Sequence, residues 1–189
     1  MQEPDEPAAR EAERALPARS EDLEHLAALV EQAVAALGAA RGGEALLAEG
    51  ELASLVGGAG PAARDRPPVG QPGRAAAGAL AALLASRDAL LLGGWCSGAL
   101  VGVALAERTG GGEDHAVPVT GQLRLLYVEP GARGAGVGSA LLEAALRWCT
   151  DLRCAAIDVA ALPGDRATKS LLERHGFRAR TIVMRRLLA

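Results

Sequence analysis

Residues 131–138 hold four glycines and one arginine, directly before a stretch rich in leucine and alanine. Glycine loses more backbone entropy on folding than other residues, so this density indicates a backbone that lies close against another group. Where such a turn opens a helix, its N–H groups and the positive end of the helix dipole attract an anion. The spacing therefore predicts a phosphate-binding turn, with N–H donors from Arg133 to Ser139 and a further donor in the Ser139 hydroxyl.

A P-loop is the first pattern that shares part of this spacing. Gly131 and Gly136 have the required separation. However, Val137 and Gly138 stand where a P-loop has its lysine and its hydroxyl residue. Because no side chain would then reach the β- and γ-phosphates, the chemistry excludes a P-loop.

A Rossmann dinucleotide-binding turn is the second pattern. Gly134 and Gly136 begin its G-x-G-x-x-G signature, but Ser139 stands in the third place. Asp158 follows about 20 residues on, as a ribose-binding acid does. In a Rossmann turn the glycines follow their strand at once, whereas residues 129–133 intervene here. A dinucleotide-binding oxidoreductase domain therefore stays as an alternative with a poorer match.

A third pattern fits at every position. Residues 128–142 read V-x-P-x-x-R-G-x-G-V-G-x-x-L-L, which resembles the acetyl-CoA-binding motif of the GNAT superfamily of N-acyltransferases. The motif core, [QR]-x-x-G-x-[GA], corresponds to Arg133, Gly136 and Gly138. The resemblance implies an α/β fold of mixed α+β type, in which helices flank a mostly antiparallel central sheet with splayed parallel strands. It also implies acetyl-CoA as the acyl donor and a primary amine, on a small molecule or a protein, as the acceptor.

The resemblance extends to the segments on either side of this motif. Residues 163–177, PGDRATKSLLERHGF, resemble the family's next helix and the glycine–phenylalanine pair after it. Residues 126–128 resemble the strand that is splayed to admit the pantetheine arm. The cofactor-binding residues that the resemblance implies are Leu126, Tyr127, Val128, Arg133, Gly134, Ala135, Gly136, Val137, Gly138, Ser139, Asp165 and Leu172.

Three residues depart from the family pattern. Leu172 stands where a tyrosine often protonates the departing thiolate, and leucine has no proton to give. Gln122 replaces a strand glutamate that often acts as a general base. Asp165 replaces an asparagine and, when ionised, accepts hydrogen bonds but donates none. Thr168 and His175, on the same helical face as Leu172, are the candidates for a substitute acid.

The sequence thus predicts an N-acetyltransferase in which the amine attacks the thioester directly, since alignment of the reactants contributes much of such a rate. The departures at Leu172 and Gln122 leave an alternative, a GNAT-like acyl-CoA-binding or regulatory module with weak turnover.

Composition limits the partners and the compartment. The chain has 189 residues and a formal net charge of −3, which argues against a nucleic-acid surface. Cys96, Cys149 and Cys154 form no CxxC pair, and none pairs with a histidine at the spacing of a metal site. The acidic start of the sequence and the lack of a membrane-length apolar run predict a cytoplasmic protein without membrane contact. We expect a monomer or homodimer.

The hydrophobic periodicity predicts a flexible tail at 1–14 and a single acetyltransferase domain at 15–189, with a Gly/Ala/Pro-rich segment at 38–73. Helices are predicted at 20–37, 45–56, 74–86, 137–149 and 166–175. Extended segments are predicted at 15–19, 89–95, 98–107, 122–128 and 154–162, followed by one or two closing strands at 177–188. Strands that first pair antiparallel and then alternate with helices indicate a mixed α/β domain.

Overall fold

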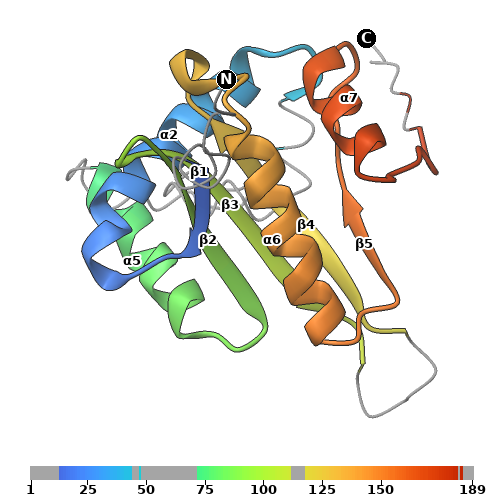
Figure 1. The fold of residues 1–189 in the computed structure, drawn as a ribbon, viewed down its shortest axis with the longest axis horizontal. Coiled ribbons are helices and arrows are strands. Elements are labelled where there is room, and N and C mark those ends of the chain that lie inside the picture. Colours follow the sequence, from blue (N-terminus) through green and yellow to red (C-terminus); the bar gives the residue numbers. More distant parts are fainter. Residues whose placement is uncertain (1–12, 44–46, 48–71, 112–117, 183, 185–189) are drawn as a thin grey trace, which may run out of the picture.

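The computed structural model of the chain describes residues 13–43, 47, 72–111, 118–182 and 184. Five strands form one sheet in the order β1-β2-β3-β4-β5 (Figure 1). The strands are β1 (Glu13–Pro17), β2 (Ala89–Cys96), β3 (Ala99–Thr109), β4 (Thr120–Val128) and β5 (Ala156–Val159). The helices are α2 (Leu23–Ala39), α5 (Pro72–Ala85), α6 (Val137–Asp151) and α7 (Arg166–Arg174), with 3-10 turns η1 (Ser20–Asp22) and η2 (Pro130–Ala132).

Strand direction in the sheet follows the predicted mixed pattern. β1 to β4 pair antiparallel in sequence order, and β5 runs parallel to β4. Ser97 and Gly98 close the β2–β3 hairpin with φ angles of 48° and 81°, the left-handed conformations of a tight hairpin turn. β1 begins at Glu13, so the sheet includes two residues of the predicted tail. The mixed, mostly antiparallel sheet is thereby confirmed.

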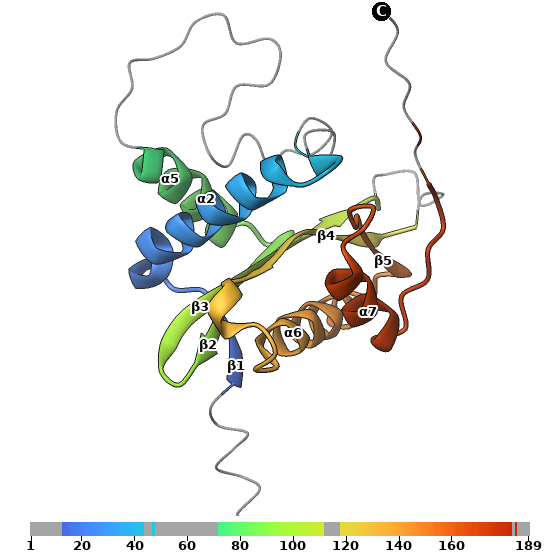
Figure 2. The same cartoon turned by 90° about the horizontal axis from the view of Figure 1, so that it is seen from above.

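Helices cover both faces of the sheet. Figure 2 shows α2 and α5 together on one face and α6 with α7 on the other. The buried apolar residues between the sheet and helices α2 and α5 include Leu26, Leu29, Val30, Leu80, Val103, Leu105 and Leu125. Those on the α6 face include Leu92, Ala104, Leu123, Val137, Leu141, Leu142 and Leu172.

Two glycines bring α6 close to the sheet. A Cβ atom on Gly94 of β2 would lie 2.6 Å from Cγ1 of Val137, and one on Gly102 of β3 would lie 3.1 Å from Cδ1 of Leu141. A larger residue at either position would push the helix outward. Because Gly102 is opposite Val128, this close packing holds the first turn of α6 over the end of β4.

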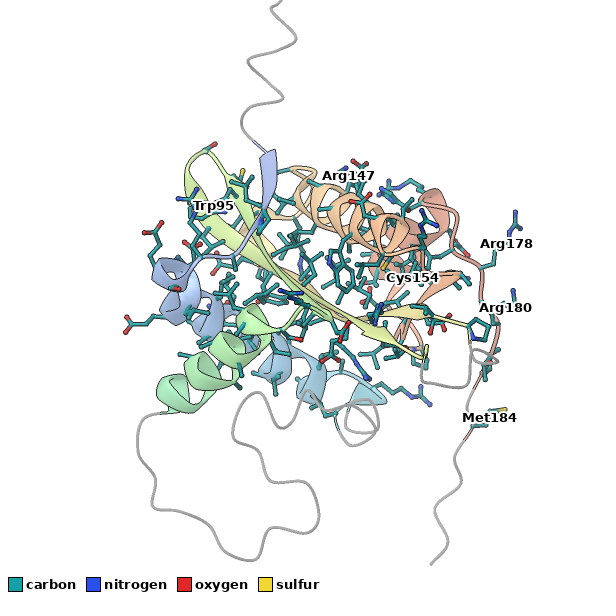
Figure 3. All side chains as sticks on the ribbon, turned by 90° about the horizontal axis from the view of Figure 1, so that it is seen from below. Trp95, Arg147, Cys154, Arg178, Arg180 and Met184 are labelled. Carbon is teal, nitrogen blue, oxygen red and sulfur yellow. The ribbon has the colours of Figure 1, made fainter. Side chains whose placement is uncertain are left out.

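The predicted closing strands are wrong for the residues that the structure describes after α7. Residues 177–182 and 184 contain no strand, and Met184 is 91% exposed. Phe177 packs against the α6 core, but Ala179 and Thr181, the next residues on the same side of an extended chain, offer little apolar area to bury. Figure 3 shows Met184 apart from the packed body.

Some predictions fall on residues that the structure does not describe. They are the tail at 1–12, the helix at 45–56 except Leu47, the rest of the glycine-rich segment up to residue 71, residues 112–117 of the connection before β4, and residues 183 and 185–188 of the closing strands.

Candidate active site

β4 and β5 part from one another halfway along β4 (Figure 1). Their parallel pairing ends with Leu123 opposite Val159, whereas β4 continues to Val128. In the described part of the chain, no strand lies beside residues 124–128 on the side that faces β5. This opening has the splayed strands that the resemblance implies, and it lies at the C-terminal end of β4.

A β-bulge stands where the opening begins. Leu105 of β3 is opposite Leu125, and Ala106 is opposite Leu123, so Arg124 is an extra residue in β4. A bulge bends its strand and increases the local twist. The bend therefore accompanies the separation of β4 from β5.

Backbone groups of Leu126 and Val128 face the opening. The N–H of Glu129 donates to the carbonyl oxygen of Val101 on β3 at 2.9 Å. The direction of backbone hydrogen bonding alternates along an antiparallel strand. The N–H of Tyr127 therefore also points to β3, whereas the N–H groups of Val128 and Leu126 point away from β3. These two N–H groups can donate to a molecule that lies along the free edge of β4.

The loop from β4 to α6 combines an arginine contact with two left-handed backbone positions. Nε of Arg133 donates to the carbonyl oxygen of Val128 at 3.1 Å and so folds the loop back on the strand end. Gly134 and Gly136 have φ angles of 89° and 87°, which residues with a Cβ adopt at a cost. Ala135 lies half-buried between them. The path of the loop thus requires glycine at both positions.

The N-terminus of α6 is open. Gly136 is its N-cap residue, and no side chain caps the first turn. Ala140 donates to the carbonyl oxygen of Gly136 at 3.0 Å, so the helical bonding begins there. The N–H groups of Val137, Gly138 and Ser139 precede it and have no acceptor within the helix. With the helix dipole behind them, they form a place where an anion can bind.

α7 packs against this helix start. Asp165 is the N-cap of α7, and its Oδ1 accepts from the N–H of Thr168 at 3.0 Å. Leu172 is only 5% exposed and packs in the α6 core. A Cβ atom on Gly138 would lie 3.4 Å from Cδ2 of Leu171. Asp165 and Leu172 thus have structural contacts, and their roles toward a cofactor stay predictions.

The two candidates for a substitute acid lie at opposite ends of α7. Thr168 is half-buried in the first turn, and His175 follows the last. Nδ1 of His175 donates to the carbonyl oxygen of Leu171 at 2.9 Å, and its Nε2 lies 3.5 Å from Oε1 of Glu143 on α6. The Nε2 contact therefore joins the end of α7 to α6, whereas the Nδ1 hydrogen bond stays within the last turn of α7. The acid role of either residue stays a prediction.

α2 crosses the opening on the other face of the sheet. Oη of Tyr127 donates to Oε1 of Gln32 at 3.3 Å, and Nε2 of Gln32 donates to Oε1 of Glu129 at 3.5 Å. Beyond the end of α2, a Cβ atom on Gly42 would lie 3.8 Å from Cδ of Pro163, in the loop after β5. α2 and the residues after it thus extend from the end of β4 to the β5–α7 loop.

Reasoning from the sequence missed a half-buried ion pair at the start of the opening. Nε of Arg124 donates to Oε2 of Glu107 at 2.8 Å, and their side chains are 27% and 22% exposed. Val103, Leu105 and Glu107 alternate along β3, which places Glu107 on the face that α2 covers. Glu107 continues the alternation of Val103 and Leu105 with a carboxylate in place of an apolar residue. This pattern in the sequence could have predicted the ion pair.

Cys149 offers no nucleophile for acyl transfer. Burial raises the pKa of the Cys149 thiol to about 11, and the neighbouring Cys154 adds to the shift. Cys149 is therefore a neutral thiol near pH 7. Across the described residues, no group of histidine, cysteine and acidic side chains is placed to hold a metal ion.

The open helix start, the glycine loop and the free strand edge meet at one end of β4. The sequence model of the Acetyltransferase (GNAT) family matches residues 63–177, well over half of the chain. The chain belongs to the GNAT acetyltransferase family. The GNAT match includes the glycine loop and both parallel strands, so the resemblance seen in residues 128–142 is confirmed.

Solved structures share this GNAT fold. AAC(6')-Iy, in complex with the bisubstrate analog CoA-S-monomethyl-acetylneamine, has a TM-score of 0.59 and 18% identity, with 93% of this chain and 99% of that chain covered. A Trypanosoma brucei acetyltransferase has a TM-score of 0.58 and 18% identity at the same coverage. A transcriptional regulator from Bacillus halodurans has a TM-score of 0.62 and 14% identity, again over 93% and 99%. Identities this low show the fold alone.

No curated protein matches the chain in sequence. Within the residues that the structure describes, no helix combines the length and the apolar character of a membrane span.

Proposed function

We propose that this GNAT protein is an N-acetyltransferase that transfers the acetyl group of acetyl-CoA to a primary amine. The observation that carries the proposal is the uncapped N-terminus of α6 beside the free edge of β4. A helix start offers N–H donors to a pyrophosphate, and a free strand edge offers donors to the amide groups of a pantetheine arm. Residues 129–136 join the two directly.

The donor set of the site fits a CoA thioester. The N–H groups of Val137, Gly138 and Ser139 would hold the pyrophosphate, and the Ser139 hydroxyl adds a donor. The N–H groups of Leu126 and Val128 would bind the pantetheine arm and the thioester. A donor placed at the thioester carbonyl stabilises the negative charge that develops on its oxygen, a role we assign to the N–H of Val128.

Chemistry in this proposal rests on alignment. The amine nitrogen attacks the thioester carbon, and CoA leaves as a thiolate. Because α6 and the glycine loop lie on one face of the sheet and α2 on the other, we assign the α2 face to the amine. Leu172 supplies no proton to the thiolate, so the held geometry of the two reactants must supply most of the rate.

An acyl-CoA-binding or regulatory module with little turnover is the second candidate. The observation that favours it is the side chain of Leu172, which is buried in the core and has no ionisable group. The dinucleotide alternative loses its basis, because Asp158 is opposite Gln122 at the closed end of the opening. The glycine loop begins at the other end of β4, where a ribose-binding acid would be needed.

Thermal unfolding with acetyl-CoA, CoA and NAD tests the donor, and release of CoA thiol with a panel of amines tests the transfer. We expect acetyl-CoA and CoA to raise Tm and NAD to leave it unchanged. The panel should hold polyamines, amino acids, a lysine peptide and an aminoglycoside, since one similar structure contains an acetylneamine conjugate. A shift with acetyl-CoA but no thiol release would favour the module without turnover, and a shift with NAD alone would overturn both candidates.

A further inference from the structure

The chain reverses tightly at the C-terminal end of α6. Leu152 is the C-cap of the helix, and Arg153 follows it with a φ angle of 54°. The N–H of Cys154 donates to the carbonyl oxygen of Cys149 at 2.9 Å, and the N–H of Arg153 donates to that of Thr150 at 3.0 Å. These two hydrogen bonds around a left-handed residue define a Schellman motif.

A Schellman motif commonly includes a side-chain contact between the third-last residue of the helix and the second residue beyond the cap. Cysteines occupy both positions here, Cys149 inside the helix and Cys154 beyond it. The Cys154 thiol is also the neighbouring group that adds to the raised pKa of Cys149, as expected for two sulfur atoms that lie close together. The turn therefore holds a pair of thiols side by side.

The two thiols differ in their access to solvent. Cys149 is 4% exposed, and its Sγ lies against Gly121 of β4, where a Cβ atom would collide with it. Cys154 is half-buried and lies just before β5. A thiol reagent in solution would therefore reach Cys154 first, with Cys149 as the internal second partner.

The third cysteine lies too far away to join this pair. Cys96 is opposite Ala99 at the β2–β3 hairpin. Gly121, the contact of Cys149, is opposite Arg108 near the other end of β3. Because a strand rises about 3.3 Å per residue, most of the length of β3 separates the two places. Cys96 is thus an internal control for any reaction of the pair.

We propose that Cys149 and Cys154 are a thiol–disulfide modification site, which a small-molecule disulfide oxidises to an intramolecular bond. The Cys154 thiolate attacks one sulfur atom of the reagent, whose S–S bond breaks and releases one thiolate. The Cys149 thiol then gives its proton to solvent, and its sulfur attacks the Cys154 sulfur of the mixed disulfide and releases the second thiolate. The protein loses two electrons, and the reagent is reduced to two thiols. This inference is independent of the proposed function.

The bond would tie the end of α6 to the segment that enters β5. The N–H of Ala155 donates to the carbonyl oxygen of Val119 at 2.8 Å, and Ala156 is opposite Thr120. A cross-link between α6 and this segment restricts the unfolded chain more than the folded one. We therefore expect the oxidised protein to unfold at a Tm about 2–8 °C higher than the reduced protein.

Treatment of the full chain with oxidised glutathione at pH 8 tests the proposal. Trypsin cleaves after Arg147, Arg153 and Arg166, so the two cysteines fall in separate peptides, 148–153 and 154–166. We expect mass spectrometry to find these peptides joined by a disulfide, and to find them separate again after dithiothreitol. The joined peptides should exceed the glutathione adduct of the second peptide by at least about ten-fold, because a thiol held in contact reacts at a high effective concentration.

Variants of single cysteines separate this pair from general thiol oxidation. Cys96→Ser is the matched control, which should give the same joined peptides and the same rise in Tm. Cys149→Ser should hold Cys154 as a glutathione adduct, and Cys154→Ser should form no joined peptide, both without the rise in Tm. Wild-type protein without joined peptides, whether Cys154 is free or carries glutathione, would overturn the proposal, as would a bond that includes Cys96. An oxidised wild type with a Tm no higher than that of the reduced protein would show that the bond does not fit this turn, and would also overturn it.

Discussion

A Cβ atom on Gly138 would lie 3.4 Å from Cδ2 of Leu171, so the first turn of α6 and helix α7 meet with room for one methyl group. The position where a Cβ atom would stand on Gly138 therefore faces α7. The N–H of Gly138 is one of the free donors at the start of α6. We expect Gly138→Ala to change the free energy of unfolding by less than about 1 kcal/mol, and Gly138→Leu to lower it by about 1–3 kcal/mol. Urea unfolding measures both. A Gly138→Leu protein as stable as the wild type would contradict the packing of α7 on α6.

Gly136 should respond differently, because its φ angle of 87° and its place at the helix start both matter. Gly136→Asp puts a strained residue and a negative charge where we place the pyrophosphate. We expect the thermal shift with acetyl-CoA to be abolished. Gly98→Asp is the matched control, since Gly98 has a φ angle of 81° in the β2–β3 hairpin and a Cβ atom there would point into open space. That variant should keep the shift, and loss of the shift in both would show that strain alone explains it.

Local patterns account for what the sequence predicts correctly. The glycine loop and α6 follow from the motif at 128–142, and the hairpin follows from two apolar runs separated by Ser97 and Gly98. The residues that determine a turn, a hairpin or the start of a helix are neighbours in the sequence, so these elements can be predicted from the sequence alone. The closing strands are wrong for the residues described after α7, where Ala179 and Thr181 are small and the larger apolar side chains of Ile182 and Met184 lie exposed.

The ion pair of Glu107 and Arg124 at the opening could not be predicted in the same way. It depends on which residue of β3 is opposite which residue of β4, and the extra residue Arg124 shifts that register. Register is decided by the packing of whole strands, since a slip of one residue would turn Glu107 to the other face. The position of Gln122 along β4 predicts that a general base has been replaced there. It does not show that Glu107 of β3 is opposite Gln122.

His175 is expected to act in stability more than in catalysis. His175→Ala removes the contacts with Leu171 and Glu143, so we expect it to lower the free energy of unfolding by about 1 kcal/mol. We expect kcat to stay within about two-fold of wild type, since both ring nitrogens are engaged. Thr168→Val should be measured beside it, with kcat and urea unfolding as readouts. A large loss of kcat with unchanged stability in one variant would identify that residue as the acid.

The Cys149 thiol should resist alkylation in the folded protein. Burial raises its pKa from 9.0 to about 11, and only the thiolate reacts. At pH 8 we expect iodoacetamide to modify Cys96 and Cys154 before Cys149, with all three reacting in urea. Because the folded pKa is the raised one, the stability from burying this thiol is present below pH 9.0 and lost as the pH rises toward 11. Rapid modification of Cys149 at pH 8, read by peptide mass spectrometry, would contradict its burial.

The contact between Tyr127 and Gln32 provides a test of the side from which the amine enters. Oη of Tyr127 donates to Oε1 of Gln32 at 3.3 Å and so ties α2 to the end of β4 on the face that we assign to the acceptor. Tyr127→Phe removes this hydrogen bond and keeps the ring. A single hydrogen bond contributes about 0.5–1.5 kcal/mol to stability, which sets the upper limit of its effect on the amine site, so we expect KM for the amine to rise by at most about 12-fold while KM for acetyl-CoA is unchanged. Thr109→Val deletes the contact with Thr120 at the opposite end of β4 and should leave both constants as they are. If Tyr127→Phe raises KM for acetyl-CoA and not for the amine, then α2 does not border the acceptor, and the amine must enter from another side.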